Sequence, residues 1–163
     1  MKQPKQLSPK AVELIMPLLL SEFTAFYQYR AMSNYCQGVG YEKAAAFFLK
    51  ESEDELTHAK KLEKILVDWN VVVELPMLEA PKTEFTDLVD VIETAYEMEY
   101  DLYELYNDKL PKVMAMNQGL YIKMYELMDN QFNAVAEYSD KLNMLEGVDP
   151  TKTNLLLLEE KLF

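Results

Sequence analysis

Four long segments of this chain each carry a stripe of apolar residues that recur in steps of three and four. This period places the apolar side chains on one face of an α-helix, whereas a β-strand would alternate in steps of two. Because a helix with one apolar face has to bury it against another element, four such helices predict an all-α four-helix bundle. The low glycine content, 4 of 163 residues, agrees with a largely helical chain.

Local signals mark the ends of these segments. Ser8 and Pro9 suit a helix start, since serine caps helices and proline fits their first turn. Gly40 and Gly147 are typical of helix ends. The apolar run near the C-terminus predicts a short fifth helix. We expect one domain over residues 1–163, with helices at about 8–37, 41–69, 84–113, 118–145 and 154–162.

Prolines mark two further features of this bundle. Pro17 cannot bond to the carbonyl of Glu13, so we expect it to kink or delay the first helix. Pro76 and Pro81 lie in the stretch between the second and third helices. We interpret that stretch as a crossover of about sixteen residues, which is long unless it spans the length of a bundle.

Each apolar stripe is interrupted near its middle by one polar residue. The four are Glu22, Glu55, Glu99 and Gln131. A carboxylate buried without a partner is costly, so buried acids are normally paired or bound to metal. No lysine or arginine lies on the stripes, so three acids meeting in one core would need cations to stay ionised. The alternative is that the stripes are misphased and these residues face water.

The only histidine, His58, follows Glu55 by three residues, so both project from one helical face. This is the ligand spacing of carboxylate-bridged di-iron sites in four-helix bundles, and also that of a surface salt bridge. Carboxylate oxygens with one imidazole suit iron or manganese. We expect Glu55 to bridge two metals, Glu22 to complete the ion beside His58, and Glu99 to complete the other.

Two more residues are candidates near these ligands. Tyr29, two turns after Glu22, is placed to hydrogen-bond a ligand carboxylate or bound oxygen, or it is simply a core tyrosine. Gln131 is a weak ligand, or it orients a bound water or peroxide.

Charge and cysteine content limit the partners. The formal net charge of −12 argues against a nucleic-acid partner, because phosphate binding needs a basic surface. Cys36 is the only cysteine, so no intramolecular disulfide can form, which fits a reducing compartment. We find neither a signal peptide nor a membrane span in the pattern, and expect a cytoplasmic protein without a membrane partner.

The chain resembles non-haem ferritins from Pro9 to its end. The first helix has the family's glutamate with a tyrosine seven residues later. The second has a similar alanine- and phenylalanine-rich start before its Glu-x-x-His. The resemblance is carried by Glu22–Tyr29, Ala44–Leu49, Glu55–Ala59, Ala95–Glu99, Gln131 with Ala134, and Leu155–Leu162.

The resemblance implies a ferritin-like fold with a ferroxidase centre and iron storage. The centre would oxidise two Fe(II) with dioxygen or hydrogen peroxide and pass Fe(III) to a mineral inside a homo-oligomeric cage, in ferritins of 24 chains. The apolar run Leu155–Leu158 is expected to bury against neighbouring subunits, as the fifth helix does in such cages. The implied ferroxidase residues are Glu22, Tyr29, Glu55, His58, Glu99 and Gln131.

Several positions depart from the family. A third iron site of bacterial ferritins would fall on Asn130, Asn133 and Ala134, so we expect it to be absent. Leu56 replaces the haem-binding methionine of bacterioferritins, so we expect no haem. Mineral-nucleating and channel acids of animal ferritins are largely missing, at Asp54, Thr57, Lys60, Tyr121 and Met124.

Two rival interpretations remain. A rubrerythrin-like peroxidase needs a second Glu-x-x-His in the fourth helix and usually a Cys-x-x-Cys module, and neither is present. A non-catalytic scaffold or cage subunit built on the same bundle would tolerate apolar replacements of the ligand set, which are more stable in a core.

Overall fold

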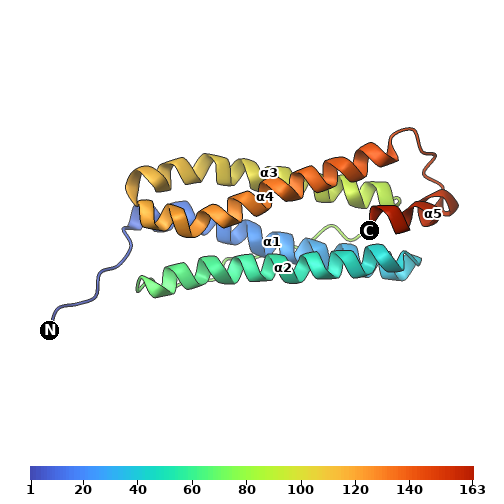
Figure 1. Cartoon of the computed structure of the whole chain (residues 1–163). Helices are drawn as coiled ribbons and strands as arrows, with labels where there is room; N and C mark the ends of the chain where they lie inside the picture. The colour runs from blue at the N-terminus through green and yellow to red at the C-terminus, as the bar shows by residue number, and fades with distance from the viewer.

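The chain folds into five α-helices without strands in the computed structural model, which describes residues 1–163. The helices are α1 (Pro9–Val39), α2 (Glu42–Asp68), α3 (Leu88–Met116), α4 (Gln118–Leu145) and α5 (Lys152–Leu162). In Figure 1 the α1–α2 pair lies beneath the α3–α4 pair, and the connection from Trp69 to Asp87 returns along the bundle. The predicted all-α bundle with a long crossover and a short fifth helix is confirmed.

Side-chain caps define the start of every helix except α2. The Ser8 hydroxyl accepts a hydrogen bond from the Ala11 amide at 3.2 Å, and Gly40 ends α1 in the left-handed region at φ 89°. Asn117 caps two helices. Its backbone amide donates to a carbonyl in the last turn of α3, and its side chain accepts from a backbone amide in the first turn of α4. Each cap satisfies a backbone group that the helix itself leaves without a partner.

The third helix begins later and ends later than expected. Its predicted start at residue 84 is wrong, because the Asp87 carboxylate caps the helix by accepting from the Asp90 amide at 3.0 Å. The helix then continues through Pro111 to Met116. Likewise α5 starts at Lys152 rather than 154, with Thr151 as its cap.

Pro17 does not delay the first helix. The α1 helix begins at Pro9 and includes Pro17. Proline leaves the carbonyl of Glu13 without its helical donor. Glu13 is exposed, so water can replace that donor and the helix continues.

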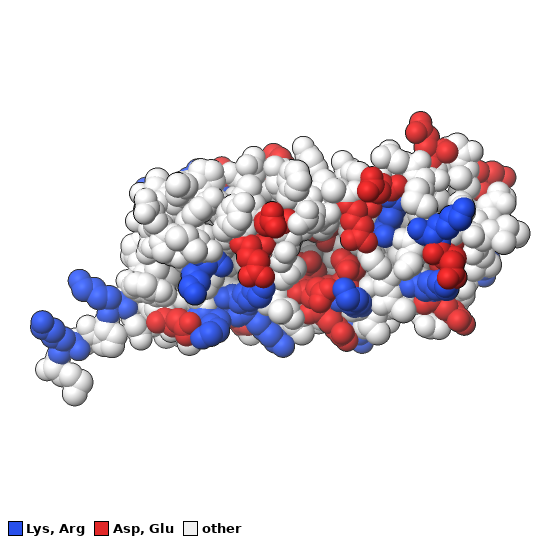
Figure 2. Space-filling model, viewed as in Figure 1, with Lys and Arg blue, Asp and Glu red and all other residues white.

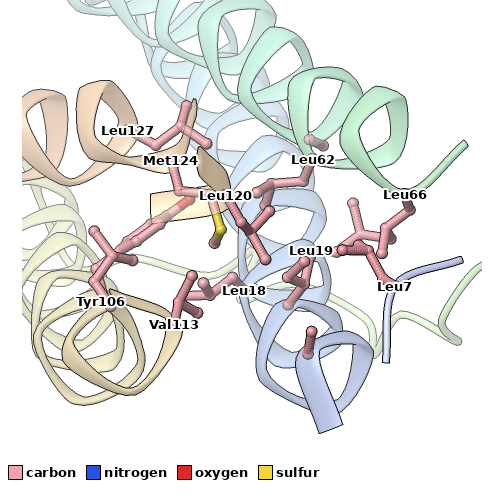
Figure 3. Close-up of a cluster of buried hydrophobic side chains, with 14 of the residues drawn as sticks. Leu7, Leu18, Leu19, Leu62, Leu66, Tyr106, Val113, Leu120, Met124 and Leu127 are labelled. Carbon is pink, nitrogen blue, oxygen red and sulfur yellow. The ribbon is translucent and has the colours of Figure 1, made fainter. Parts of the chain in front are cut away.

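The apolar core consists of two clusters of 15 buried residues each. One joins the first half of α1 to the end of α2, the second half of α3 and the start of α4, around Leu19, Leu62 and Tyr106 (Figure 3). The other joins the opposite ends of the same helices and α5, around Phe48 and Ile92. The four polar interruptions lie between these two clusters along every helix, so the centre of the bundle is a polar layer.

The apolar stripe expected on the fourth helix runs through Tyr121, Met124, Met128, Gln131, Val135, Tyr138 and Leu142. The buried face of α4 differs from this stripe in phase. Met124, Gln131 and Tyr138 are buried as expected, whereas Tyr121 and Val135 are only partly buried. The core instead takes residues one position away from the predicted stripe: Leu120, Leu127 and Lys141.

The fifth helix packs on its own chain more than the sequence suggested. Within the run Leu155–Leu158, Leu155 is fully buried in the second core cluster, while Leu156 and Leu157 are 40% and 74% exposed. Glu159 accepts hydrogen bonds from the Lys43 and Ala44 amides at 2.8 and 2.9 Å. The expectation that the whole run buries against neighbouring subunits is therefore wrong for Leu155.

Cys36 lies near the C-terminal end of α1 and is fully buried. Burial raises the pKa of its thiol to about 12. A thiol that stays protonated at neutral pH is a poor nucleophile, so Cys36 behaves as a small apolar residue of the core.

None of the helices combines the length and the apolar character that crossing a membrane would require.

Candidate metal centre

The four polar interruptions meet inside the bundle. Glu22, Glu55, Glu99 and Gln131 come from α1, α2, α3 and α4, and are 0%, 4%, 0% and 2% exposed. The alternative that the stripes are misphased and these residues face water is wrong. Each carboxylate therefore depends on protein groups or a bound ion in place of water.

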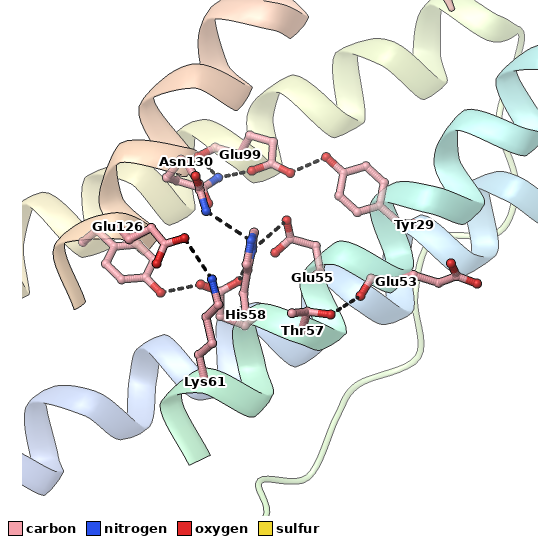
Figure 4. A network of polar contacts seen from close by, with 12 residues as sticks. Tyr29, Glu53, Glu55, Thr57, His58, Lys61, Glu99, Glu126 and Asn130 are labelled. Atoms are coloured by element: carbon pink, nitrogen blue, oxygen red, sulfur yellow. Dashed lines mark hydrogen bonds and ion pairs between the residues drawn. The ribbon is translucent and has the colours of Figure 1, made fainter. Parts of the chain in front are cut away.

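One half of the layer surrounds His58. The Nδ1 atom of His58 lies 3.6 Å from Oε2 of Glu22 and 3.4 Å from Oε1 of Glu55 (Figure 4). One ligand atom from each of these three residues lies within 4.8 Å of the others. The Oε2 atoms of both glutamates are buried without a hydrogen-bond partner. Two glutamate carboxylates that each keep an unpaired oxygen, close to an imidazole nitrogen, are a donor set for a divalent cation.

The other half of the layer surrounds Glu99, and its acceptors are already used. The Tyr29 hydroxyl donates to Oε1 of Glu99, and the Gln131 side-chain amide donates to Oε2. The same amide also donates to the Glu99 backbone carbonyl at 3.2 Å. A cation on this side would have to compete with the Gln131 amide.

Tyr106 is a neighbour of the centre that sequence reasoning missed. Its hydroxyl donates to Oε1 of Glu22, and its ring is fully buried. Tyr106 lies on the apolar stripe of the third helix, where its pattern predicts only one more core residue. The available signal was spacing, since Tyr106 follows Glu99 by seven residues, as Tyr29 follows Glu22.

Burial dominates the electrostatics of the layer. It raises the pKa of Glu55 well above the usual value, and the charge of Glu22 adds to this. Burial also raises the pKa of Glu99 to about 8, although the Tyr29 hydrogen bond opposes the shift. For His58, burial lowers the pKa, but the nearby Glu22 carboxylate outweighs it and the net pKa is raised. The metal-free layer thus holds protons that a cation would displace.

A small hollow of about 280 Å³ opens from this layer between α2 and α4. On the face viewed in Figure 2, acidic side chains gather near the middle of the bundle. Burial, together with the charge of Glu137, raises the pKa of Glu51 to about 7. Neither Glu51 nor Glu137 was among the site residues predicted from the sequence. The hollow is lined by Glu51, Asp54, Glu55, His58, Asn130, Gln131, Asn133, Ala134 and Glu137.

The three positions examined for a third iron site all line this hollow. The side-chain nitrogen of Asn130 lies 3.4 Å from Nε2 of His58. Asn133 and Ala134 supply no carboxylate. The absence of a third site of the family's kind stays a prediction.

The other family positions lie outside the centre. Asp54, Thr57 and Lys60 are exposed on α2, and Leu56 is partly buried. Met124, where animal ferritins place a channel acid, is fully buried in the first core cluster. Its place on the apolar stripe of α4 is the reason. Tyr121 is partly buried.

Comparison with known proteins agrees with this geometry. A non-heme ferritin of Staphylococcus haemolyticus is 29% identical over 157 residues, which cover 96% of this chain and 95% of that protein. One of Staphylococcus aureus is 23% identical over the same shares.

Solved structures show the same fold. The open pore ferritin from the archaeon Archaeoglobus fulgidus superposes with a TM-score of 0.88 at 22% identity, over 96% of both chains. A humanized archaeal ferritin gives 0.88 at 21% identity, also over 96% of both chains. The family model described as the ferritin-like domain matches residues 13–148. With most of its length matched by that model, the chain belongs to the ferritin family.

Proposed function

We propose that this protein oxidises Fe(II) to Fe(III) at the polar layer and stores the iron within an oligomeric cage. The observation that carries the proposal is that two buried carboxylates, those of Glu22 and Glu55, lie within 3.6 Å of His58 Nδ1 and each keep one oxygen without a hydrogen-bond partner. Apolar residues would be more stable at such positions, so unpaired acids in a core point to a ligand. Non-heme ferritins among its relatives support iron as that ligand.

The residues divide into two cation positions that share Glu55. Glu22 and His58 would hold one Fe(II), and Glu99 with Gln131 would hold the other. Two Fe(II) ions held together can deliver two electrons to one oxidant, reducing dioxygen to hydrogen peroxide or hydrogen peroxide to water. The protein's part is to hold both substrate ions at once and to let the oxidised iron leave.

The two positions are unequal in this chain. Glu22 keeps a free oxygen, whereas both oxygens of Glu99 accept hydrogen bonds from neutral groups. Binding at the Glu99 side has to displace the Gln131 amide. We infer weaker binding there, which would favour release of the oxidised ion over permanent retention.

Binding of Fe(II) must also release protons. Glu55 and Glu99 have raised pKa values in the metal-free protein, mainly because they are buried. Their carboxyl groups become ligands only after losing those protons. The hollow lined by Glu51 and Glu137 offers a polar route to water for both the protons and the arriving cation.

Aerobic addition of Fe(II), followed by ultraviolet absorbance of Fe(III), tests the proposal. Wild-type protein should oxidise Fe(II) faster than buffer. Glu55→Ala should lose at least about 100-fold in rate, because the residue contacts both positions. Glu53→Ala, an exposed acid on the same helix, should keep the wild-type rate.

Equal rates of Fe(II) oxidation with and without wild-type protein would instead support the interpretation as a non-catalytic scaffold. Oxidation by hydrogen peroxide alone would favour the rubrerythrin-like peroxidase. The cytoplasmic location stays a prediction, as does an assembly of 24 chains.

A further inference from the structure

Two buried tyrosines stand in matching positions beside the acids of the candidate centre. Tyr29 follows Glu22 by seven residues on α1, and Tyr106 follows Glu99 by seven residues on α3. Seven residues are about two helical turns, so each tyrosine shares a face with its glutamate. The hydroxyl groups donate crosswise, from Tyr29 to Glu99 and from Tyr106 to Glu22.

We propose that Tyr106 is a positioning residue that aims Glu22 at the cation position beside His58. The proposal rests on the function proposed above and adds a residue to it. Tyr106 would act through Glu22 and would not itself touch the substrate ion.

The hydrogen bond from Tyr106 gives the two carboxylate oxygens of Glu22 different roles. Oε1 accepts from the Tyr106 hydroxyl, while Oε2 has no hydrogen-bond partner and lies 3.6 Å from His58 Nδ1. A hydrogen bond on one oxygen restricts rotation of the carboxylate about its last single bond. Tyr106 therefore keeps Oε2 directed toward His58 and Glu55, where a cation would find it.

No other group in the structure donates a hydrogen bond to the carboxylate of Glu22. Glu99, in contrast, has both Tyr29 and Gln131. Loss of one donor leaves Glu99 with another, whereas loss of the Tyr106 hydroxyl leaves the Glu22 carboxylate without a hydrogen-bond donor. Removing that hydroxyl should therefore weaken cation binding at the position beside His58.

The test is Tyr106→Phe, which keeps the buried ring and removes only the hydroxyl. The matched control is Tyr138→Phe, because Tyr138 is also buried but its hydroxyl has no hydrogen-bond partner. Zn(II), which is not oxidised, is titrated calorimetrically into metal-free protein, and His58→Ala identifies the binding step that needs the imidazole. Tyr106→Phe should weaken that step about 10- to 100-fold. The other step, and both steps of Tyr138→Phe, should match wild type.

A double-mutant cycle separates positioning from a general packing effect. In a Glu22→Gln background, Tyr106→Phe should cause no further loss of zinc affinity, because the residue acts through Glu22. Independent losses would overturn the proposal, as would unchanged zinc binding in Tyr106→Phe. A Tyr106→Phe protein that loses its helical circular dichroism would also overturn it, since the hydroxyl would then serve folding.

Failure of this inference can be told from failure of the proposed function. If wild-type protein shows no His58-dependent zinc step and no Fe(II) oxidation, both proposals fail. If wild type binds zinc and oxidises iron while Tyr106→Phe is indistinguishable from it, only the role of Tyr106 fails.

Discussion

The buried acids receive hydrogen bonds from neutral groups rather than from cationic side chains. Tyr106 donates to Glu22, and Tyr29 and Gln131 donate to Glu99. A lysine or arginine at these places would form an internal ion pair and cancel the charge that attracts a metal. Neutral donors reduce the cost of burial yet leave each carboxylate able to bind a cation.

The raised pKa of Glu99 predicts how the metal-free protein responds to pH. Its folded-state pKa is about 8 against an ordinary value of 4.5. The folded state therefore binds this proton more tightly than the unfolded state does. The stability it contributes is complete below pH 4.5 and is lost as pH rises through about 8.

We expect the free energy of unfolding of metal-free protein to fall between pH 5 and pH 8. The contribution of Glu99 is about 1.4 kcal/mol per pH unit at most. Urea unfolding of Glu99→Gln should show a shallower fall, whereas Glu97→Gln, exposed on the same helix, should follow wild type. A Glu99→Gln slope equal to that of wild type would contradict the assigned direction.

Sequence reasoning reached these residues only in part. A polar residue inside an apolar stripe can be recognised from the sequence alone. This pattern located four residues on buried faces: Glu22, Glu55, Glu99 and Gln131. Hydrogen bonds such as Tyr106 to Glu22 join different helices, and their existence depends on how the helices cross. Glu51 and Glu137 lie off the stripes, so only the folded chain brings them together.

At the scale of the helices, α5 acts as a cap for α2. Tyr41 precedes α2 without any side-chain hydrogen bond to the helix. The Glu159 carboxylate supplies what is missing by accepting from two amides in the first turn of α2, those of Lys43 and Ala44. The negative charge also suits the positive end of the α2 dipole.

Glu159→Ala should therefore destabilise the protein by about 1–2 kcal/mol, the usual loss for a helix cap with a favourable charge. Glu160→Ala is the control, since Glu160 is 75% exposed and pairs only with Lys43 at the surface. That change should cost less than about 1 kcal/mol. Urea midpoints measure both, and equal midpoints would refute the capping role of Glu159.

The helices themselves were more predictable than their ends. Periodicity over about thirty residues averages out local exceptions, which is why α1, α2 and α3 follow their stripes. Their limits depend on single caps such as Asp87, and the phase of α4 depends on its packing partners. The docking of α5 combines its buried Leu155 and Leu162 with Glu159, a charged residue that no apolar pattern reveals.

For the whole molecule, the polar layer separates two apolar cores that share the same helices. An ion bound by Glu22, Glu55 and His58 would join α1 to α2 at the place where apolar contact is missing. An ion that binds only to the folded state raises the stability of that state by mass action, so iron or zinc should stabilise the folded bundle.

The exposed leucines of α5 bear on assembly. Leu156 and Leu157 are 40% and 74% exposed on a single chain, next to the buried Leu155. If they cover a neighbouring copy in a cage, light scattering after size-exclusion chromatography should give a mass many times the 19.0 kDa of one chain. Leu157→Glu should lower that mass. Wild type eluting as a single chain, or an unchanged mass for Leu157→Glu, would count against assembly through α5.

The sequestered thiol of Cys36 makes the molecule convenient to label. Because that sulfur is enclosed and stays protonated, maleimide reagents should ignore it in the native state. A cysteine engineered anywhere on the exterior would then be the sole attachment point per polypeptide. Fluorophores or spin probes could be placed one by one without first deleting a natural residue.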